Sequence, residues 1–276
     1  MKKTWFITGA SSGFGLSILK LLLSRGHKVA ATARNLEPLG RIKEQYPDNL
    51  WIMELDIKDS NLVHNVVNDA FNHFKTIDVV VNNAGYGLFG AAEEITNDQI
   101  ERIIDTNLMG SIRVIRAFLT HFRKQNGGRI LQVSSEGGQV AYPNFSAYHA
   151  SKWGIEGFVE STAQEVSSFN IEFTIVEPGP TRTSFGKSLD TAEPIEAYRN
   201  TVSGKMRESF SNGIFTPKGD LEKMANAIVN SVDVTPAPFR LALGATAFEN
   251  INNALNERLA VLHAMKSVTL NVDVDA

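Results

Sequence analysis

The sequence predicts an α/β fold in which a doubly wound sheet of seven mainly parallel strands is flanked by helices. Short apolar or β-branched segments alternate with longer amphipathic ones, which is the pattern of repeated βα units. Segment 79–81 is apolar throughout, and such runs indicate strands buried on both faces of a parallel sheet. The amphipathic stretches between strands are long enough to cross over to the next parallel strand.

The same periodicity places each element in chain order. We expect strands at residues 5–8, 28–32, 51–55, 79–82, 129–134, 172–176 and 240–243. We expect helices at 15–24, 60–74, 97–124, 147–168 and 218–231, and a helical tail at 247–265. Segment 183–217 has little strand signal and contains three glycines and two prolines. We interpret it as an excursion from the sheet that serves as a small substrate lid.

The composition indicates a single globular domain over residues 1–276. With 43% hydrophobic and 21% charged residues, the chain can form one sizeable core. The net charge of -3 and the scattered basic residues predict no nucleic-acid partner. No apolar run is long enough to span a membrane and the first strand begins close to Met1, so we expect no membrane association and a cytoplasmic location. The chain has no cysteine, which excludes disulfides and cysteine chemistry.

The turn after the first predicted strand is rich in glycine. Residues 8–15 read Thr-Gly-Ala-Ser-Ser-Gly-Phe-Gly, a strand that passes through closely spaced glycines into a helix. Such a turn lets the backbone approach a pyrophosphate, whose charge is stabilised at the helix N-terminus. The spacing differs from Gly-x-Gly-x-x-Gly, so a tightly packed turn of small residues is the alternative.

Three polar residues are spaced so that they can converge on one carbonyl group. Tyr148 and Lys152 are four residues apart in a predicted helix, which places them on one face about 6 Å apart. Ser135 follows a predicted strand directly, at the sheet edge where α/β proteins bind ligands. A solvated surface pair is the alternative for Tyr148 and Lys152 taken alone.

These residue types suit hydride transfer to a ketone. The alkoxide that forms needs a proton donor and groups that hold its oxygen. We expect Tyr148 to be the acid, with Lys152 as a neighbouring cation that favours the phenolate. Ser135 would orient and polarise the carbonyl.

The end of the second predicted strand bears on cofactor choice. An NAD enzyme of this type carries an acidic residue there for the ribose 2′-hydroxyl. The sequence has Ala31-Thr-Ala-Arg-Asn35 instead, and Arg34 offers a planar fork for a 2′-phosphate. Ser11 or Ser12 could add a hydroxyl to the same phosphate. We therefore predict NADP(H), the alternative for Arg34 being an exposed loop arginine.

These motifs, in this order, resemble the single-domain short-chain dehydrogenase/reductases, which have a Rossmann fold and a nicotinamide cofactor. The resemblance covers most of the chain and includes Asn82-Asn-Ala-Gly85 after the fourth strand and Pro178-Gly-Pro-Thr-Arg-Thr183 after the sixth. It implies that Asn107 joins the three residues above through a water-mediated relay toward Lys152, and that Lys152 also binds the nicotinamide ribose. The catalytic set it implies is Asn107, Ser135, Tyr148 and Lys152. With Arg34, the expected cofactor-binding set is Gly9, Ser11, Ser12, Gly13, Phe14, Gly15, Arg34, Asp56, Ile57, Asn83, Ala84, Gly85, Tyr148, Lys152, Pro178, Gly179, Thr181 and Thr183.

The substrate pocket is expected in loops beyond the carboxyl ends of the strands. These loops offer apolar and aromatic side chains, which favour an apolar or aromatic carbonyl compound unless they simply pack the loops: Tyr86, Leu88, Phe89, Tyr142, Phe145 and Phe185. Glu136 would face either the site or the solvent. His149 shares no helix face with Tyr148, so we expect a structural role for it. The six histidines form no metal-ligand pattern, and we expect no metal.

The sequence thus predicts an NADPH-dependent carbonyl reductase, or alcohol dehydrogenase in reverse. Residues 236–244 and the helical tail are similar to the branch of the family that includes 17β-hydroxysteroid dehydrogenase-like reductases. The family resemblance also implies a homodimer or homotetramer that pairs the helices of Asn107 and Tyr148. Two alternatives remain open: a catalytically silent protein that senses NADP(H) or binds a partner, and an epimerase acting through a transient ketone.

Overall fold

A seven-stranded parallel sheet forms the centre of the molecule, as predicted. The computed structural model describes residues 2–182, 186, 189–213 and 216–274 of the chain. The sheet strands are β1 (Thr4–Thr8), β2 (Lys28–Ala33), β3 (Leu50–Glu54), β4 (Val79–Asn82), β6 (Gly128–Val133), β7 (Ile171–Pro178) and β9 (Arg240–Leu243). Their order is β3-β2-β1-β4-β6-β7-β9, and every neighbouring pair is parallel. Successive strands are added toward one edge of the sheet from β1 to β3 and toward the other edge from β4 onward. Ligands of doubly wound sheets bind at the point between β1 and β4 where this order reverses.

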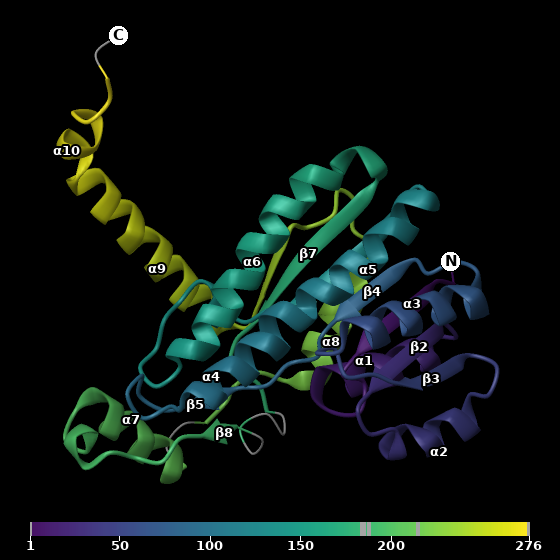
Figure 1. Ribbon diagram of the computed structural model, residues 1–276, viewed down its shortest axis with the longest axis horizontal. Helices are drawn as coiled ribbons and strands as arrows, with labels where there is room; N and C mark the ends of the chain where they lie inside the picture. The colour runs from purple at the N-terminus through teal and green to yellow at the C-terminus, as the bar shows by residue number, and fades with distance from the viewer. Residues whose placement is uncertain (1, 183–185, 187–188, 214–215, 275–276) are drawn as a thin grey trace.

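Helices cover both faces of this sheet (Figure 1). The helices of the body are α1 (Gly13–Ser24), α2 (Glu37–Gln45), α3 (Ser60–Phe74), α4 (Asn97–Ile104), α5 (Ser111–Lys124), α6 (Ser146–Val166), α7 (Val202–Ser211) and α8 (Leu221–Asn230). Short 3₁₀ turns are η2 (Glu136–Gly138), η3 (Ser167–Phe169), η5 (Glu196–Tyr198) and η6 (Ser231–Asp233). Helices α1 and α8 pack against one face, and α3, α5 and α6 against the other.

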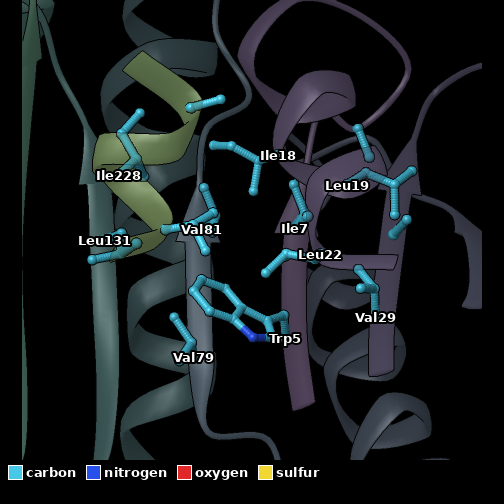
Figure 2. Close-up of a cluster of buried hydrophobic side chains, with 14 of the residues drawn as sticks. Trp5, Ile7, Ile18, Leu19, Leu22, Val29, Val79, Val81, Leu131 and Ile228 are labelled. Atoms are coloured by element: carbon cyan, nitrogen blue, oxygen red, sulfur yellow. The ribbon is translucent and has the colours of Figure 1, made fainter. Parts of the chain in front are cut away.

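Strand β1 shows why apolar residues follow one another in the middle of a central strand, here Trp5 to Ile7. Trp5 and Ile7 point into the cluster formed with α1 and α8, which Figure 2 shows with Ile18 and Ile228. Phe6 points the opposite way and stacks edge-on against Phe118 of α5, with ring centroids 4.9 Å apart. Successive strand side chains alternate between faces, so a segment covered on both faces has apolar residues at consecutive positions.

Three features differ from the sequence prediction. The predicted helix 97–124 is interrupted by a π-helical segment, η1 (Asp105–Gly110). The predicted lid contains helix α7 and strand β8 (Asp190–Thr191), and β8 pairs with β5 (Leu88–Phe89) in a second, two-stranded sheet. Helix α2 was not predicted, because its nine residues contain a single buried apolar side chain, Leu39.

The C-terminal helices form an arm that leaves the body. Helix α9 (Ala245–Ala264) begins beside β9, and with α10 (Lys266–Leu270) it projects away from the sheet (Figure 1). Its first turns are anchored by buried Ala247 and Ile251, whereas Leu259 is 51% exposed. Among the described residues, no helix is both long and apolar enough to cross a bilayer.

Candidate active site

The glycine turn at the end of β1 has a backbone that other residues would not allow. Gly9 has a φ of +66°, in the left-handed region that favours glycine. A Cβ on Gly15 would lie 2.3 Å from the carbonyl oxygen of Gly9, so a side chain there cannot fit without moving backbone. Both glycines are therefore required by the close approach of the turn to the start of α1.

The end of β4 holds this turn in place. The Asn83 side chain donates hydrogen bonds to the carbonyl oxygens of Thr8 and Gly9, at 3.0 and 3.2 Å. The Thr8 hydroxyl accepts from the backbone N–H groups of Asn83 and Ala84, at 2.9 and 3.0 Å. Asn83 and Ala84 thus lie directly after β4, where their hydrogen bonds to Thr8 and Gly9 hold the start of the glycine turn.

The turn suits a bound pyrophosphate. Gly13 has a φ of +51°, and the space beside it is open, with no atom within 4 Å of where a Cβ would be. Ser12 caps α1 with extended backbone, and its side chain makes no capping hydrogen bond. Ser11 and Phe14 are partly buried beside it. The first N–H groups of α1 therefore remain available for an anion at the positive end of the helix dipole.

Arg34 follows β2 directly and is exposed, next to this turn. The neighbouring strand β3 leads to Asp56, whose carboxylate accepts from the backbone N–H of Lys58 and pairs with its ammonium at 3.6 Å. Ile57 is buried against the π-helical segment, where its side chain would lie 2.7 Å from a Cβ on Gly110. The strand ends that a dinucleotide would cross thus present a guanidinium at β2 and a carboxylate at β3.

Tyr148 and Lys152 lie on α6 and are buried, 9% and 7% exposed, which rules out a solvated surface pair. The Lys152 Nζ lies 5.7 Å from the centre of the Tyr148 ring and donates to the carbonyl oxygen of Val133, the last residue of β6, at 3.2 Å. Tyr148 is hydrogen-bonded to the Ser135 side chain. The three predicted residues therefore meet at the carboxyl end of β6.

Burial dominates the protonation of this group. It raises the pKa of Tyr148 to about 12, against a lowering by the Ser135 hydrogen bond, with the charges of Glu136 and Glu156 adding to the rise. Burial lowers the pKa of Lys152 to about 8, and Glu156 counteracts this. The expected lowering of the Tyr148 pKa by Lys152 is therefore not found, because desolvation disfavours the phenolate and the ammonium alike. At neutral pH the tyrosine is a phenol and the lysine is mostly an ammonium.

Asn107 is brought to the same place by the π-helical segment η1. It is 1% exposed, and its side chain pairs with the backbone of Tyr86, accepting from N–H at 3.0 Å and donating to the carbonyl oxygen at 2.8 Å. A Cβ on Gly85 would lie 3.0 Å from the Asn107 Oδ1 and 3.9 Å from the Lys152 Nζ. The side chains of Asn107 and Lys152 thus both lie next to Gly85.

The loop after Ser135 is folded by side chains near the site. Ser135 Oγ accepts from the Gly137 N–H at 3.0 Å. His149 accepts from the Tyr142 N–H through Nε2, at 2.9 Å, and its Nδ1 lies 2.8 Å from the Gly137 carbonyl oxygen. Burial lowers the pKa of His149, so the ring is neutral and donates from Nδ1. These contacts give His149 the structural role that we expected.

Glu136 is buried, 4% exposed, and does not face solvent. Its carboxylate accepts from the Tyr142 hydroxyl at 2.9 Å, and Asn250 of α9 donates to that hydroxyl at 2.8 Å and lies 3.5 Å from Glu136. A Cβ on Gly179 would lie 3.5 Å from Glu136 Oε2. Burial raises the pKa of Glu136. This residue therefore fastens the base of the arm to the loop that carries Ser135.

An aromatic cluster lies beside Tyr148. Phe145 is 6.0 Å from Tyr148 and 5.1 Å from Phe89 between ring centroids. Phe210 of α7 contacts both Phe89 and Phe145, at 5.1 and 6.0 Å. Leu88 is buried next to this group, and Tyr142 is turned toward Glu136 instead. The region predicted as a lid thus brings an aromatic side chain to the site.

The turn after β7 lies at the same edge of the sheet. The Gly179 N–H donates to the carbonyl oxygen of Leu243, and the Thr181 hydroxyl donates to the carbonyl oxygen of Gly179, at 2.9 and 2.8 Å. Pro178 is the last residue of β7 and is buried. Thr183 and Phe185, which we also expected here, lie outside the described residues.

Sequence reasoning missed several residues that support the site. Ser151 accepts from Asn107 at 3.3 Å and donates to the Tyr148 carbonyl oxygen at 2.7 Å. Its position three residues after Tyr148, on the same helix face, was the available signal. Asn250 and Phe210 come from distant helices, and no local pattern marks them. Within the described residues, no cluster of three histidine, aspartate or glutamate side chains could hold a metal ion.

The sequence is similar to a protein-family model and to known proteins over most of its length. Residues 3–194 match the family model described as short chain dehydrogenase. Oxidoreductase BOA17 of Botryotinia fuckeliana is 38% identical over 92% of this chain and 93% of its own length. Human 17-beta-hydroxysteroid dehydrogenase type 1 is 35% identical over 68% of this chain and 60% of its own length.

Solved structures agree with this. A short-chain dehydrogenase from Streptomyces avermitilis superposes with a TM-score of 0.91 at 36% identity, covering 99% of this chain and 100% of that one. The closed form of a serine dehydrogenase, solved with NADP⁺, gives a TM-score of 0.75 at 26% identity over 87% of this chain and 94% of that one. The chain therefore belongs to the short-chain dehydrogenase/reductase family of oxidoreductases.

Proposed function

We propose that the protein is an NADPH-dependent reductase of apolar or aromatic ketones, which runs as an alcohol dehydrogenase in the reverse direction. The observation that carries this is the meeting of Tyr148, Lys152 and Ser135 at the carboxyl end of β6. Asn107 approaches Lys152 at Gly85, and the glycine turn lies at the adjacent strand end. Each group that ketone reduction needs is thus present on the side of the sheet where the dinucleotide would lie.

The residues divide the reaction between them. When bound, the nicotinamide supplies the hydride, or accepts it in the reverse direction. The Ser135 hydroxyl donates to the substrate carbonyl and orients it. Tyr148, a phenol at neutral pH, gives its proton to the developing alkoxide. Lys152, mostly protonated at pH 7, stabilises the phenolate that remains. Asn107 holds the backbone of Tyr86, which follows Gly85 next to Lys152.

Arg34 supports NADP(H) as the cofactor. It stands exposed at the end of β2, where an NAD enzyme would carry a carboxylate for the ribose 2′-hydroxyl. A guanidinium there offers two parallel hydrogen bonds to a 2′-phosphate. The related serine dehydrogenase was solved with NADP⁺. We assign Ser11 and Ser12 as further donors and the Gly9–Gly15 turn as the pyrophosphate site.

The aromatic cluster supports the substrate class. Phe89, Phe145 and Phe210 pack together beside Tyr148, so the wall next to the proposed acid is aromatic, which suits a flat, apolar molecule. Buried Leu88 adds to this apolar wall.

The test uses purified protein, NADPH or NADH, and a panel of aryl ketones, keto esters, steroids and quinones. Nicotinamide absorbance reports turnover, and Tyr148→Phe is compared with the wild type. We expect NADPH consumption on at least one apolar ketone and a loss of at least about 1,000-fold in Tyr148→Phe. Equal rates would remove Tyr148 as the acid. If NADPH binds and no member of the panel is reduced, the silent NADP(H)-sensing alternative is favoured.

We also propose a homodimer or homotetramer. Met109 and Trp153, on the helical segments of Asn107 and Tyr148, are each 42% exposed. The arm carries a second apolar surface. Its exposed residues are Phe248, Leu255, Leu259, Leu262 and Met265. Apolar residues gathered in this way are typical of contacts between subunits.

A further inference from the structure

Three ionisable side chains follow one another along a single face of α6. Tyr148, Lys152 and Glu156 are spaced by four residues, which places neighbours about 6 Å apart along the helix axis. All three are buried, and Glu156 is 3% exposed. A buried carboxylate therefore lies one helical turn from the lysine of the candidate active site.

Glu156 is held from two other elements. Its Oε1 accepts from the Ser134 hydroxyl at 2.5 Å, and Ser134 directly precedes Ser135. Its Oε2 pairs with Arg240 of β9 at 2.7 Å. A Cβ on Gly138 would lie 1.7 Å from Glu156 Oε1, so the glycine leaves the space that the carboxylate occupies. The position of this charge is thus fixed by the same loop that carries the carbonyl-binding serine.

The carboxylates around Glu156 outnumber the cation that binds them. Arg240 also pairs with buried Glu177 of β7 and with Glu160, the next residue along α6 on this side. Three carboxylates therefore share one guanidinium. Glu156 is buried and lies one turn from Lys152, so the Lys152 ammonium gains from its negative charge, whereas the Glu160 side chain is 49% exposed.

We propose that Glu156 is a positioning residue for the reaction: its charge keeps Lys152 protonated and sets the upper pH limit at which the Tyr148–Lys152 pair can deliver a proton. This rests on the proposed function for the roles of Tyr148 and Lys152. A purely structural ion pair, which ties α6 to β7 and β9, is the competing explanation. The two differ in whether removing the charge moves the pH profile.

The groups that face Lys152 and Glu156 come from every element packed around them. They are Tyr148 and Glu160 of α6, the Val133 carbonyl and Ser134 at the end of β6, Ser135 and Glu136 after it, Asn107 of η1, Glu177 of β7 and Arg240 of β9. Glu156 opposes the lowering of the Lys152 pKa that burial causes, and it adds to the raised pKa of Tyr148. Neutralising Glu156 should therefore lower both pKa values.

The direction of the pH effect follows from the proton each group must hold. Ketone reduction needs Tyr148 as a phenol and Lys152 as an ammonium, so activity falls as pH rises through their pKa values. With both values lowered, the basic limb of the profile moves to lower pH. Removing a unit charge one helical turn from Lys152, in a buried site, should shift that limb by at least about one pH unit.

The first measurement is the pH dependence of kcat/KM for NADPH-dependent reduction by Glu156→Gln. Glutamine keeps the acceptor for Ser134 and removes the charge. Glu160→Gln is the matched control, because it shares Arg240 but lies a further turn from Lys152 and its side chain is 49% exposed. We expect a shift of at least about one unit for Glu156→Gln and a wild-type profile for Glu160→Gln.

A second measurement does not depend on turnover. In protein labelled with carbon-13 at the lysine ε-carbons, the Lys152 signal is identified by its loss in Lys152→Met and then titrated. We expect the Lys152 pKa to be lower in Glu156→Gln than in the wild type. In Glu156→Asp, which keeps the charge and serves as a second variant if the glutamine variant folds poorly, we expect it to be unchanged. An unchanged Lys152 titration in Glu156→Gln, or an equal shift in Glu160→Gln, would overturn the inference. Absence of turnover in the wild type would instead count against the proposed function alone.

Discussion

Replacing Lys152 by methionine should make the folded protein more stable while it removes the proposed activity. Burial holds the pKa of Lys152 at about 8 instead of 10.5, so the folded state carries a penalty for its ammonium. At 1.36 kcal/mol for each pKa unit, that penalty is about 3 kcal/mol at pH 7. Methionine forfeits the hydrogen bond to Val133, worth about 1 kcal/mol. The net expected gain is about 2 kcal/mol, or a rise of about 4 °C in Tm.

The sign of the pH dependence gives a second readout. A lysine whose folded pKa is lowered binds fewer protons in the folded than in the unfolded state between pH 8 and 10.5. Wild-type stability therefore rises across that window, and the penalty is full below it. The advantage of Lys152→Met should shrink between pH 7.5 and 9.5. The raised pKa of Tyr148 acts in the opposite direction only above about pH 10, outside this comparison.

The assay is urea unfolding at both pH values, with NADPH turnover measured on the same samples. Lys20→Met, at an exposed position of α1, is the control and should change stability by no more than about 0.5 kcal/mol. If Lys152→Met were less stable than the wild type at pH 7 by more than about 1 kcal/mol, the ammonium would not be a net cost. The account of its burial would then be wrong.

Three further substitutions test the other parts of the proposal. Arg34→Asp should raise KM for NADPH by about 100-fold and leave KM for NADH within a few fold, so an equal loss for both would remove the 2′-phosphate assignment. Gly15→Ala forces a Cβ to within 2.3 Å of the Gly9 carbonyl oxygen, so binding of either cofactor should fall by at least about 10-fold when followed by NADPH fluorescence. Leu259→Glu should lower the oligomer mass in light scattering, whereas Asn253→Glu on the polar side of α9 should not; identical masses would exclude the arm as a subunit contact.

The seven strands and the principal helices could be predicted because their signals are local. Runs buried on both faces, such as Trp5 to Ile7 of β1, are apolar at consecutive positions, and apolar residues recur in the crossover helices with a period near 3.6. The glycine turn and the pair of Tyr148 and Lys152 could be recognised for the same reason, since each depends on spacing within one element. Their meeting with Ser135 required only that the carboxyl ends of parallel strands share one edge.

The remainder depends on contacts that sequence periodicity does not carry. The π-helical segment changes hydrogen-bond register without changing the amphipathic pattern, so Asn107 was expected in a regular helix. Strands β5 and β8 have two residues each and are defined by their pairing with each other. The Tyr148 pKa was expected to fall beside a cation, whereas burial, a property of the whole fold, raises it.

The motif residues and the residues that adjust them come from different parts of the chain. Ser135, Tyr148 and Lys152 lie within the 3–194 segment that matches the family model, whereas Phe210, Arg240 and Asn250 lie beyond it. Those three contact the site through the aromatic cluster, the Glu156 carboxylate and the Glu136–Tyr142 pair, respectively. Catalytic chemistry can then be retained while the C-terminal third changes the pocket wall and the charge behind Lys152. Relatives that share the motifs but differ at these three positions should therefore differ first in substrate and pH range, and only later in reaction type.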